Sequence, residues 1–146
     1  GTENALCQAF SLKYQGKYGS PANVFGMAGS YDAAYLMAYS LASIAAGTTV
    51  DGTGMANGMD KMVGGTPIDV GTGQIQAAIG ALGSGNAIDI NGASGPLDFD
   101  LTQHEAPGDI EVWCVVLDGK GQPQFQPSGR SYDSATGQMA GTYKCP

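Results

Sequence analysis

The single histidine of the chain, His104, is followed directly by Glu105, and this pair is the first place to look for acid–base chemistry. A Ser-His-Asp type of site also needs a nucleophile and an orienting acid that converge on the imidazole from other segments. The thiol of Cys7 lies on a predicted helix far away in the sequence. We therefore predict that His104 is a solvated loop residue and that the chain is not an enzyme. An enzyme that uses His104 is kept as an alternative hypothesis.

A group of carboxylates could gather around Ca²⁺, which takes several oxygen ligands. Its members are Asp98, Asp100, Glu105 and Asp109. They lack the tight loop spacing of a calcium site, so charged strand ends are the favoured interpretation. The glycine-containing segments 52–54 and 71–73 lack the Lys-Ser/Thr ending of a phosphate-binding loop. We accordingly expect no metal and no cofactor.

Three cysteines are present, at Cys7, Cys114 and Cys145, and no pair has the Cys-x-x-Cys spacing of a zinc knuckle or a redox motif. We prefer a disulfide between Cys114 and Cys145, because Cys145 could fasten the C-terminal tail to a strand. Cys7 would then be buried or paired with a segment outside this sequence. Three reduced, buried cysteines are the alternative.

The charge balance excludes two classes of partner. The chain has 13 acidic and 6 basic residues, for a net charge of −7. Nucleic-acid binding needs clustered Lys and Arg, and an anionic membrane surface repels an acidic protein. No apolar run reaches the roughly 18 residues that span a bilayer. The opening Gly1-Thr-Glu-Asn4 does not resemble a signal peptide, so we expect the numbering to begin inside a longer precursor.

The segment from Tyr31 to Ala46 predicts the central helix of the chain. Its only charged residue is Asp32, which we place in the first turn, where the helix dipole favours an anion. Ser30 is the predicted N-cap and Gly47 the predicted stop. Apolar residues lie nearly all round this helix, so we expect neighbours to bury it on both sides.

Shorter elements surround this helix in the sequence. Helical spacing predicts helices at 4–18, 53–63 and 72–82, the second capped by Thr53. Alternation predicts strands at 87–91 and 96–100, and a β-branched run predicts a stronger one at 110–117. Turn-forming residues predict a turn at 64–67. They also predict two hairpins, one with its turn at 118–121 and a second with its turn at 134–137. These few strands form one thin layer, which is a physical reason to suspect that the chain belongs to something larger.

Several motifs, taken in order, resemble the later part of a known receptor family. They are Phe10-x-x-x-Tyr14 on a helix, a Pro-containing link, Tyr31-Asp32-Ala33 at the start of an Ala-rich helix, Gly92-Ala-Ser-Gly95 followed by Phe99-Asp100, and the 110–117 strand with Asp118-Gly-Lys120. The series, over residues 5 to 121, resembles type I periplasmic substrate-binding proteins, the Leu/Ile/Val-binding receptors of ABC transporters.

The resemblance implies an α/β fold, namely a partial periplasmic-binding-protein type I fold of Rossmann-like, two-lobe form with helices and short strands. Residues 1–108 would be the second segment of the first lobe. Residues 109–146 would be the crossover strand and C-terminal tail of the second lobe. Most of the sheets that these helices cover would come from an N-terminal part of the same protein.

The implied function is that of an extracytoplasmic solute-binding component of an ABC transporter. A small polar ligand, such as an amino acid, would bind in the cleft between the lobes, and the closed protein would dock on a membrane permease. The implied location is periplasmic or extracytoplasmic, with a lipid anchor as one option for the full precursor. A ligand-binding sensory domain of a receptor is the alternative within the same fold.

The resemblance implies four ligand-binding residues. In the family, the segment just before the Tyr-Asp-Ala helix and the first residues of that helix face the cleft. The four residues are Phe25, Met27, Ser30 and Tyr31. An aromatic ring there could cover an apolar ligand side chain, and Ser30 could offer a hydroxyl or a backbone N–H to a carboxylate. The competing interpretation is that Phe25 and Tyr31 are core residues and Ser30 is only a cap.

Overall fold

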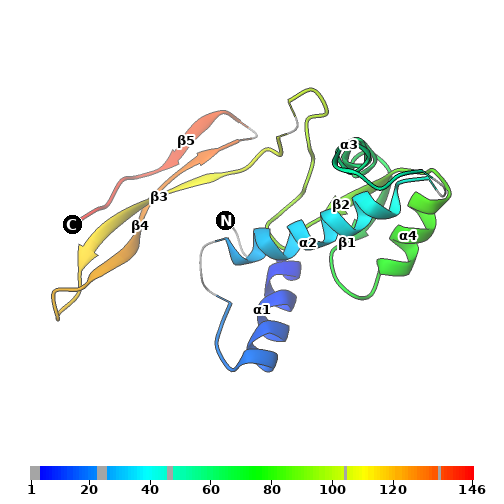
Figure 1. Cartoon of the computed structure of the whole chain (residues 1–146). Coiled ribbons are helices and arrows are strands. Elements are labelled where there is room, and N and C mark those ends of the chain that lie inside the picture. Colours follow the sequence, from blue (N-terminus) through cyan, green and yellow to red (C-terminus); the bar gives the residue numbers. More distant parts are fainter. Residues whose placement is uncertain (1–3, 23–25, 46–47, 104, 135) are drawn as a thin grey trace. The chain divides into compact units, whose positions relative to one another are not determined.

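The computed structural model describes residues 4–22, 26–45, 48–103, 105–134 and 136–146 (Figure 1). These residues form four α-helices, one 3₁₀-helix and two small β-sheets. The prediction of a mixed α/β class is confirmed at this level. The chain divides into two compact units, one that ends at Ala106 and one that runs from Pro107 to Pro146.

Helix α1 (Ala5–Tyr18) is the helix predicted at 4–18, and it begins one residue later than predicted. Its N-cap is Asn4, whose side-chain oxygen accepts the N–H of Cys7 at 2.7 Å. Gly19 ends the helix with φ 73°, a left-handed conformation that glycine adopts without steric cost.

Helix α2 (Met27–Ala42) is the predicted central helix, but it begins at Met27 rather than Tyr31. Its N-cap is Gly26, with φ 84°. The prediction of Ser30 as the cap is therefore wrong: Ser30 lies in the first turn and donates its backbone N–H to the carbonyl of Gly26 at 2.8 Å. The helix ends at Ala42, before the Ala46 that the sequence predicted.

Within the unit that ends at Ala106, neighbours cover one side of α2 and leave the other side open. Tyr39 is 1% exposed, whereas Met37 is 59% exposed and Leu41 is 47% exposed. The expectation that α2 is buried on both sides is thus wrong for the described part of the chain.

The small parallel sheet and the helix between its strands form a βαβ unit. It consists of β1 (Thr66–Asp69), α4 (Ile75–Gly83) and β2 (Ile88–Asn91). Thr66 and Pro67, predicted as a turn, instead begin β1. Pro67 has no N–H, and Asp69 donates its N–H to the Gln74 side chain at 3.2 Å, so neither offers a free donor at the outer edge of β1.

Two further predictions differ in the segments around this unit. Helix α3 (Gly52–Gly58) is capped by Asp51 rather than Thr53, and the 3₁₀-helix η1 (Met59–Lys61) continues it. The predicted strand 96–100 contributes only isolated bridges, which pair Pro96 with Asn91 and Asp100 with Glu105.

The unit from Pro107 onward is an antiparallel sheet with the strand order β3-β4-β5. It contains β3 (Ile110–Leu117), β4 (Pro123–Asp133) and β5 (Gln138–Gly141). Both predicted hairpins are confirmed. In the first turn, the Asp118 carboxylate accepts the N–H groups of Lys120 and Gln122, each at 2.8 Å.

The hydrophobic core of the described residues lies in the unit that ends at Ala106, between α2, α4 and the parallel sheet. Its members are Tyr39, Met62, Ile68, Val70, Ala78, Leu82, Ile88, Ile90, Ala93 and Leu97. The βαβ unit therefore holds the start of α2 against the loops that follow β1 and β2.

Candidate functional site

The start of α2 lies beside the carboxyl end of β1. A Cβ added at Gly71, just after β1, would lie 3.9 Å from the Tyr31 hydroxyl. The Tyr31 ring stacks on Phe10 of α1 at a centroid distance of 4.6 Å, and its edge meets Tyr35 at 5.0 Å. The loops at the carboxyl ends of parallel strands are where α/β proteins place ligands, so we take this edge as the candidate site.

The Tyr31 hydroxyl is held in a neutral, partly buried setting. It lies 3.2 Å from the Tyr35 hydroxyl, and either oxygen can donate. Burial is the main cause that raises the pKa of Tyr31 well above its usual value, and the Tyr35 hydrogen bond adds to it. At neutral pH the group can therefore donate or accept a hydrogen bond, but it does not supply a negative charge.

A buried carboxylate fastens α2 to the loop after β2. Asp32 is 1% exposed, and its carboxylate accepts the N–H of Ala93 at 2.8 Å, the N–H of Ser94 at 2.7 Å and the Ser94 hydroxyl at 2.5 Å. The prediction that Asp32 serves the helix dipole from the first turn is therefore wrong. Its role in the structure is to lock two segments together.

Glycine is required where this loop passes the carboxylate. A Cβ at Gly92 would collide with Asp32, so only glycine fits there. The loop closes on itself through the Gly92 N–H, which donates to the Gly95 carbonyl at 2.8 Å, and Gly95 has φ 133°. The Asn4 side chain also donates to the Gly92 carbonyl at 3.2 Å. The Gly-x-x-Gly spacing thus has a local physical cause.

Two further polar side chains lie at the ends of the parallel strands. The Asn91 amide at the end of β2 donates to the Asp69 carboxylate at the end of β1 at 3.2 Å. Neither Asn91 nor Asp69 was predicted from the sequence as a site residue. The signal was available, since each is a polar residue that directly follows an apolar strand residue.

Three of the four ligand-binding residues that the resemblance implies lie at the start of α2. Met27 is half-buried, Ser30 is exposed, and Tyr31 is half-buried against Phe10. Phe25 lies outside the described residues. Their role in ligand binding stays a prediction.

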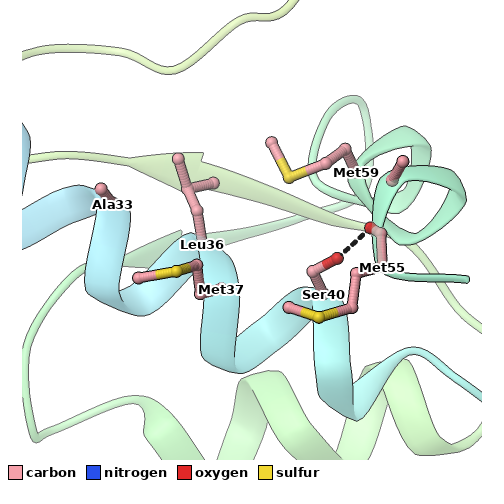
Figure 2. A pocket seen from close by; sticks show the side chains of 7 residues that line it. Ala33, Leu36, Met37, Ser40, Met55 and Met59 are labelled. Carbon is pink, nitrogen blue, oxygen red and sulfur yellow. Dashed lines mark hydrogen bonds between the residues drawn. The ribbon is translucent and has the colours of Figure 1, made fainter. Parts of the chain in front are cut away.

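A shallow hollow of about 290 Å³ lies elsewhere, between α2 and α3 (Figure 2). It is lined by Ala33, Leu36, Met37, Ser40, Met55, Ala56 and Met59. The Ser40 hydroxyl, its one side-chain polar group, is already hydrogen-bonded to the Met55 carbonyl. This hollow therefore suits an apolar side chain rather than the polar ends of an amino acid, and it shares no residue with the implied ligand set.

The described residues were also compared with the needs of a metal site and of a membrane-spanning helix. Among them, no group of three or more His, Cys, Asp or Glu side chains is placed to hold a metal ion. The catalytic alternative depended on His104, which lies outside the described part. Among the helices of that described part, none has the length and apolar character needed to cross a membrane.

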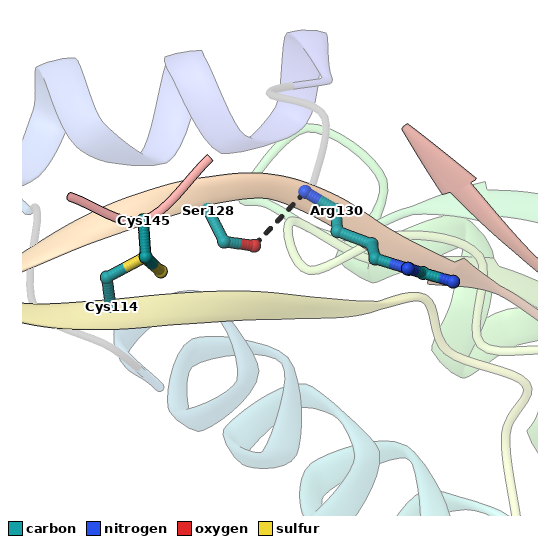
Figure 3. Close-up of a disulfide and its surroundings, with 4 residues drawn as sticks. All are labelled: Cys114, Ser128, Arg130 and Cys145. Carbon is teal, nitrogen blue, oxygen red and sulfur yellow. Dashed lines mark hydrogen bonds between the residues drawn. A yellow bond between two sulfur atoms is a disulfide. The ribbon is translucent and has the colours of Figure 1, made fainter. Parts of the chain in front are cut away.

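A disulfide joins Cys114 of β3 to Cys145 of the C-terminal tail, with a Cα–Cα distance of 5.8 Å (Figure 3). This is the pairing that the sequence analysis preferred, and Cys7 is free and partly exposed. The tail is also held by the Lys144 N–H, which donates to the Ser128 carbonyl at 2.7 Å. One face of β3 is therefore covered by the tail.

Comparison with family models, with curated proteins and with solved structures finds no match to this chain.

Proposed function

We propose that the chain is the later part of an extracytoplasmic solute-binding receptor of the periplasmic type I kind. It would bind an amino acid or a similar small polar molecule between two lobes and deliver it to the permease of an ABC transporter. The resemblance of the motifs between residues 5 and 121 suggests this function. The following physical features support it.

The open side of α2 is the observation that carries the proposal. Five neighbouring residues on that side are exposed, and none is charged: Ala33, Ala34, Met37, Ala38 and Leu41. Small residues let a helix lie close against a sheet. Burying the exposed half of Met37 and of Leu41 would contribute about 1 kcal/mol each. Such a face is what a lobe of this kind would cover with its main sheet.

The parallel pair β1–β2 is too small to be that sheet. Parallel sheets are normally buried on both faces and have more strands. A further strand could not form a regular ladder on β1, because Pro67 lacks an N–H and the N–H of Asp69 is already bonded to Gln74. The covering sheet would therefore pack against α2 as a separate layer.

The disulfide supports an extracytoplasmic location. Disulfides persist in the periplasm and outside the cell, whereas cytosolic reductants keep most thiols reduced. Cys114 is 6% exposed and lies in a regular strand, which is typical of a structural disulfide rather than a catalytic one.

The candidate site has hydrogen-bonding groups that would suit one end of an amino-acid ligand, its carboxylate. Tyr31 presents a neutral phenol beside the Gly71 loop, and Ser30 is exposed in the first turn of α2, where backbone N–H groups and the helix dipole favour a carboxylate. The Asp32 lock would keep both residues in place relative to the strands.

The experiment is a thermal-shift screen of the protein that the whole gene encodes, with amino acids, small amides and related acids at about 1 mM. A ligand present at about 100 times its Kd stabilises a protein by roughly 2.7 kcal/mol, which is several degrees in Tm. Ser30→Ala should weaken the response without loss of stability, since Ser30 is exposed. Ser84→Ala, an exposed serine after α4, is the matched control. No shift with any member of the panel would count against the proposal.

A further inference from the structure

The face of the β3–β4 hairpin opposite the disulfide is apolar and open. Residues paired across an antiparallel sheet point to the same side, and the register pairs Trp113 with Pro127, Val115 with Phe125, and Leu117 with Pro123. Cys114 points to the other side, towards the tail (Figure 3). The apolar sheet face is hence defined by these six residues: Trp113, Val115, Leu117, Pro123, Phe125 and Pro127.

The size of this face suits a weak interface between proteins. The exposed fractions are 49% for Trp113, 67% for Val115, 71% for Leu117 and 77% for Phe125. These four side chains leave on the order of 500 Å² of apolar surface in water, near the upper end for the largest patch of a monomer. Two such faces together would bury on the order of 1,000 Å², which is the lower limit for a specific interface.

The charges at the ends of the face indicate what covers it. Glu111 is exposed two residues before Trp113 in β3. The register shifts between Val112 and Trp113, but the unpaired residues, 128 and 129, are in β4, so alternation along β3 places Glu111 on the side of Trp113. Lys120 is exposed in the turn at the other end of the hairpin. A two-fold axis across the strands, at the level of Val115, would bring Glu111 of one copy to Lys120 of the other, twice.

We infer that the apolar sheet face is a self-association surface, on which a second copy of this chain stacks with β3 antiparallel to its own β3. In this arrangement Phe125 would lie over its own counterpart, and Glu111 of each copy would lie near Lys120 of the other, in the turn that also contains Asp118. The face holds no charged residue between its ends. This inference rests on the unit from Pro107 onward and not on the proposed ligand.

Sedimentation velocity of the disulfide-intact 146-residue chain tests the inference, from about 1 μM to about 1 mM. We expect a monomer–dimer equilibrium with a micromolar Kd, and a blue shift of Trp113 emission on association, because Trp113 is the only tryptophan. Val115→Asp and Phe125→Asp should each weaken the dimer at least about 50-fold. Leu12→Asp, at a 70% exposed apolar residue of the other unit, is the matched control and should leave it unchanged.

Charge reversal tests the orientation of the two copies. Glu111→Lys and Lys120→Glu should each raise the Kd about three- to tenfold, and the double variant should restore it to within about twofold. A chain that stays monomeric, a dimer that tolerates Val115→Asp, or a double variant as weak as the single ones would overturn the inference. Trp113 emission of the monomeric variants checks that the sheet remains folded.

Discussion

Replacing Asp32 by Asn should destabilise the unit that ends at Ala106 far more than the change of one atom suggests. The carboxylate accepts three hydrogen bonds while almost fully buried. Asn keeps the shape but has one acceptor oxygen, and its amide group would face the N–H or O–H donors of Ser94. Hydrogen bonds to a charged group contribute about 1.5–3 kcal/mol each, and a buried donor left without a partner costs about 1–3 kcal/mol. We predict that Asp32→Asn lowers the free energy of unfolding of this unit by about 2–4 kcal/mol.

The assay is urea denaturation followed by far-UV circular dichroism, because every described helix belongs to that unit. With a slope of about 2 kcal/mol/M, the midpoint should fall by about 1–2 M. Trp113 fluorescence reports the other unit in the same sample and should change little.

Two further variants give this prediction its controls. Ser94→Ala removes only the hydroxyl bond to Asp32 and should cost about 1 kcal/mol. Asp98→Asn changes an exposed carboxylate nearby in the sequence and should stay within about 0.5 kcal/mol of the parent. If Asp32→Asn behaves like Asp98→Asn, the lock between α2 and the loop after β2 is not what stabilises this unit.

Three further predictions concern buried groups and the disulfide. Tyr39→Phe should leave the free energy of unfolding unchanged or raise it by up to about 1 kcal/mol, as measured by urea denaturation. The reason is that, among the described residues, the Tyr39 hydroxyl is buried without a hydrogen-bond partner. A free energy of unfolding lowered by more than about 1 kcal/mol would contradict this. The pKa of Tyr31 is raised in the folded state, so its contribution to stability is complete below pH ~10 and is lost as the pH rises from there. The urea midpoint should therefore fall more between pH ~8 and pH ~11 for the parent than for Tyr31→Phe, and equal falls would exclude this cause. Replacing both Cys114 and Cys145 by Ser removes a disulfide with a sequence separation of 31. This should destabilise the β-sheet unit by about 2–4 kcal/mol, measured by urea denaturation followed by Trp113 fluorescence. An unchanged urea midpoint would show that other contacts hold the tail.

The sequence predicted the elements best where local chemistry decides them. The β3–β4 hairpin follows from the β-branched run of β3 and from Asp118 in the turn, and α1 follows from its own caps. The start of α2 was missed because Gly26 caps it through a left-handed backbone rather than through a side chain. β1 was missed because Pro67 indicates a turn, although an edge strand also accepts it.

The candidate site was less predictable because its parts are far apart in the sequence. Asp32 is 61 residues from Ala93 and 62 from Ser94, so no local pattern shows that they meet. Local spacing placed Asp32 near the start of a helix, where the helix dipole offered a sufficient reason for a carboxylate. The unpartnered hydroxyl of Tyr39, among the described residues, likewise depends on packing that only the fold defines.

Chemical labelling at position 37 measures whether a separate layer covers the open side of α2 in the whole protein, as the proposed function requires. Met37→Cys is made in a Cys7→Ser background, with Ser84→Cys as the exposed control, both in this chain and in the protein of the whole gene. In the 146-residue chain, the thiol introduced at position 37 should react with a maleimide as fast as the control thiol, because Met37 is 59% exposed. In the whole protein, the account predicts a reaction at position 37 that is at least about 100-fold slower, with the control thiol unchanged. Equal rates at position 37 in the two proteins would contradict the account.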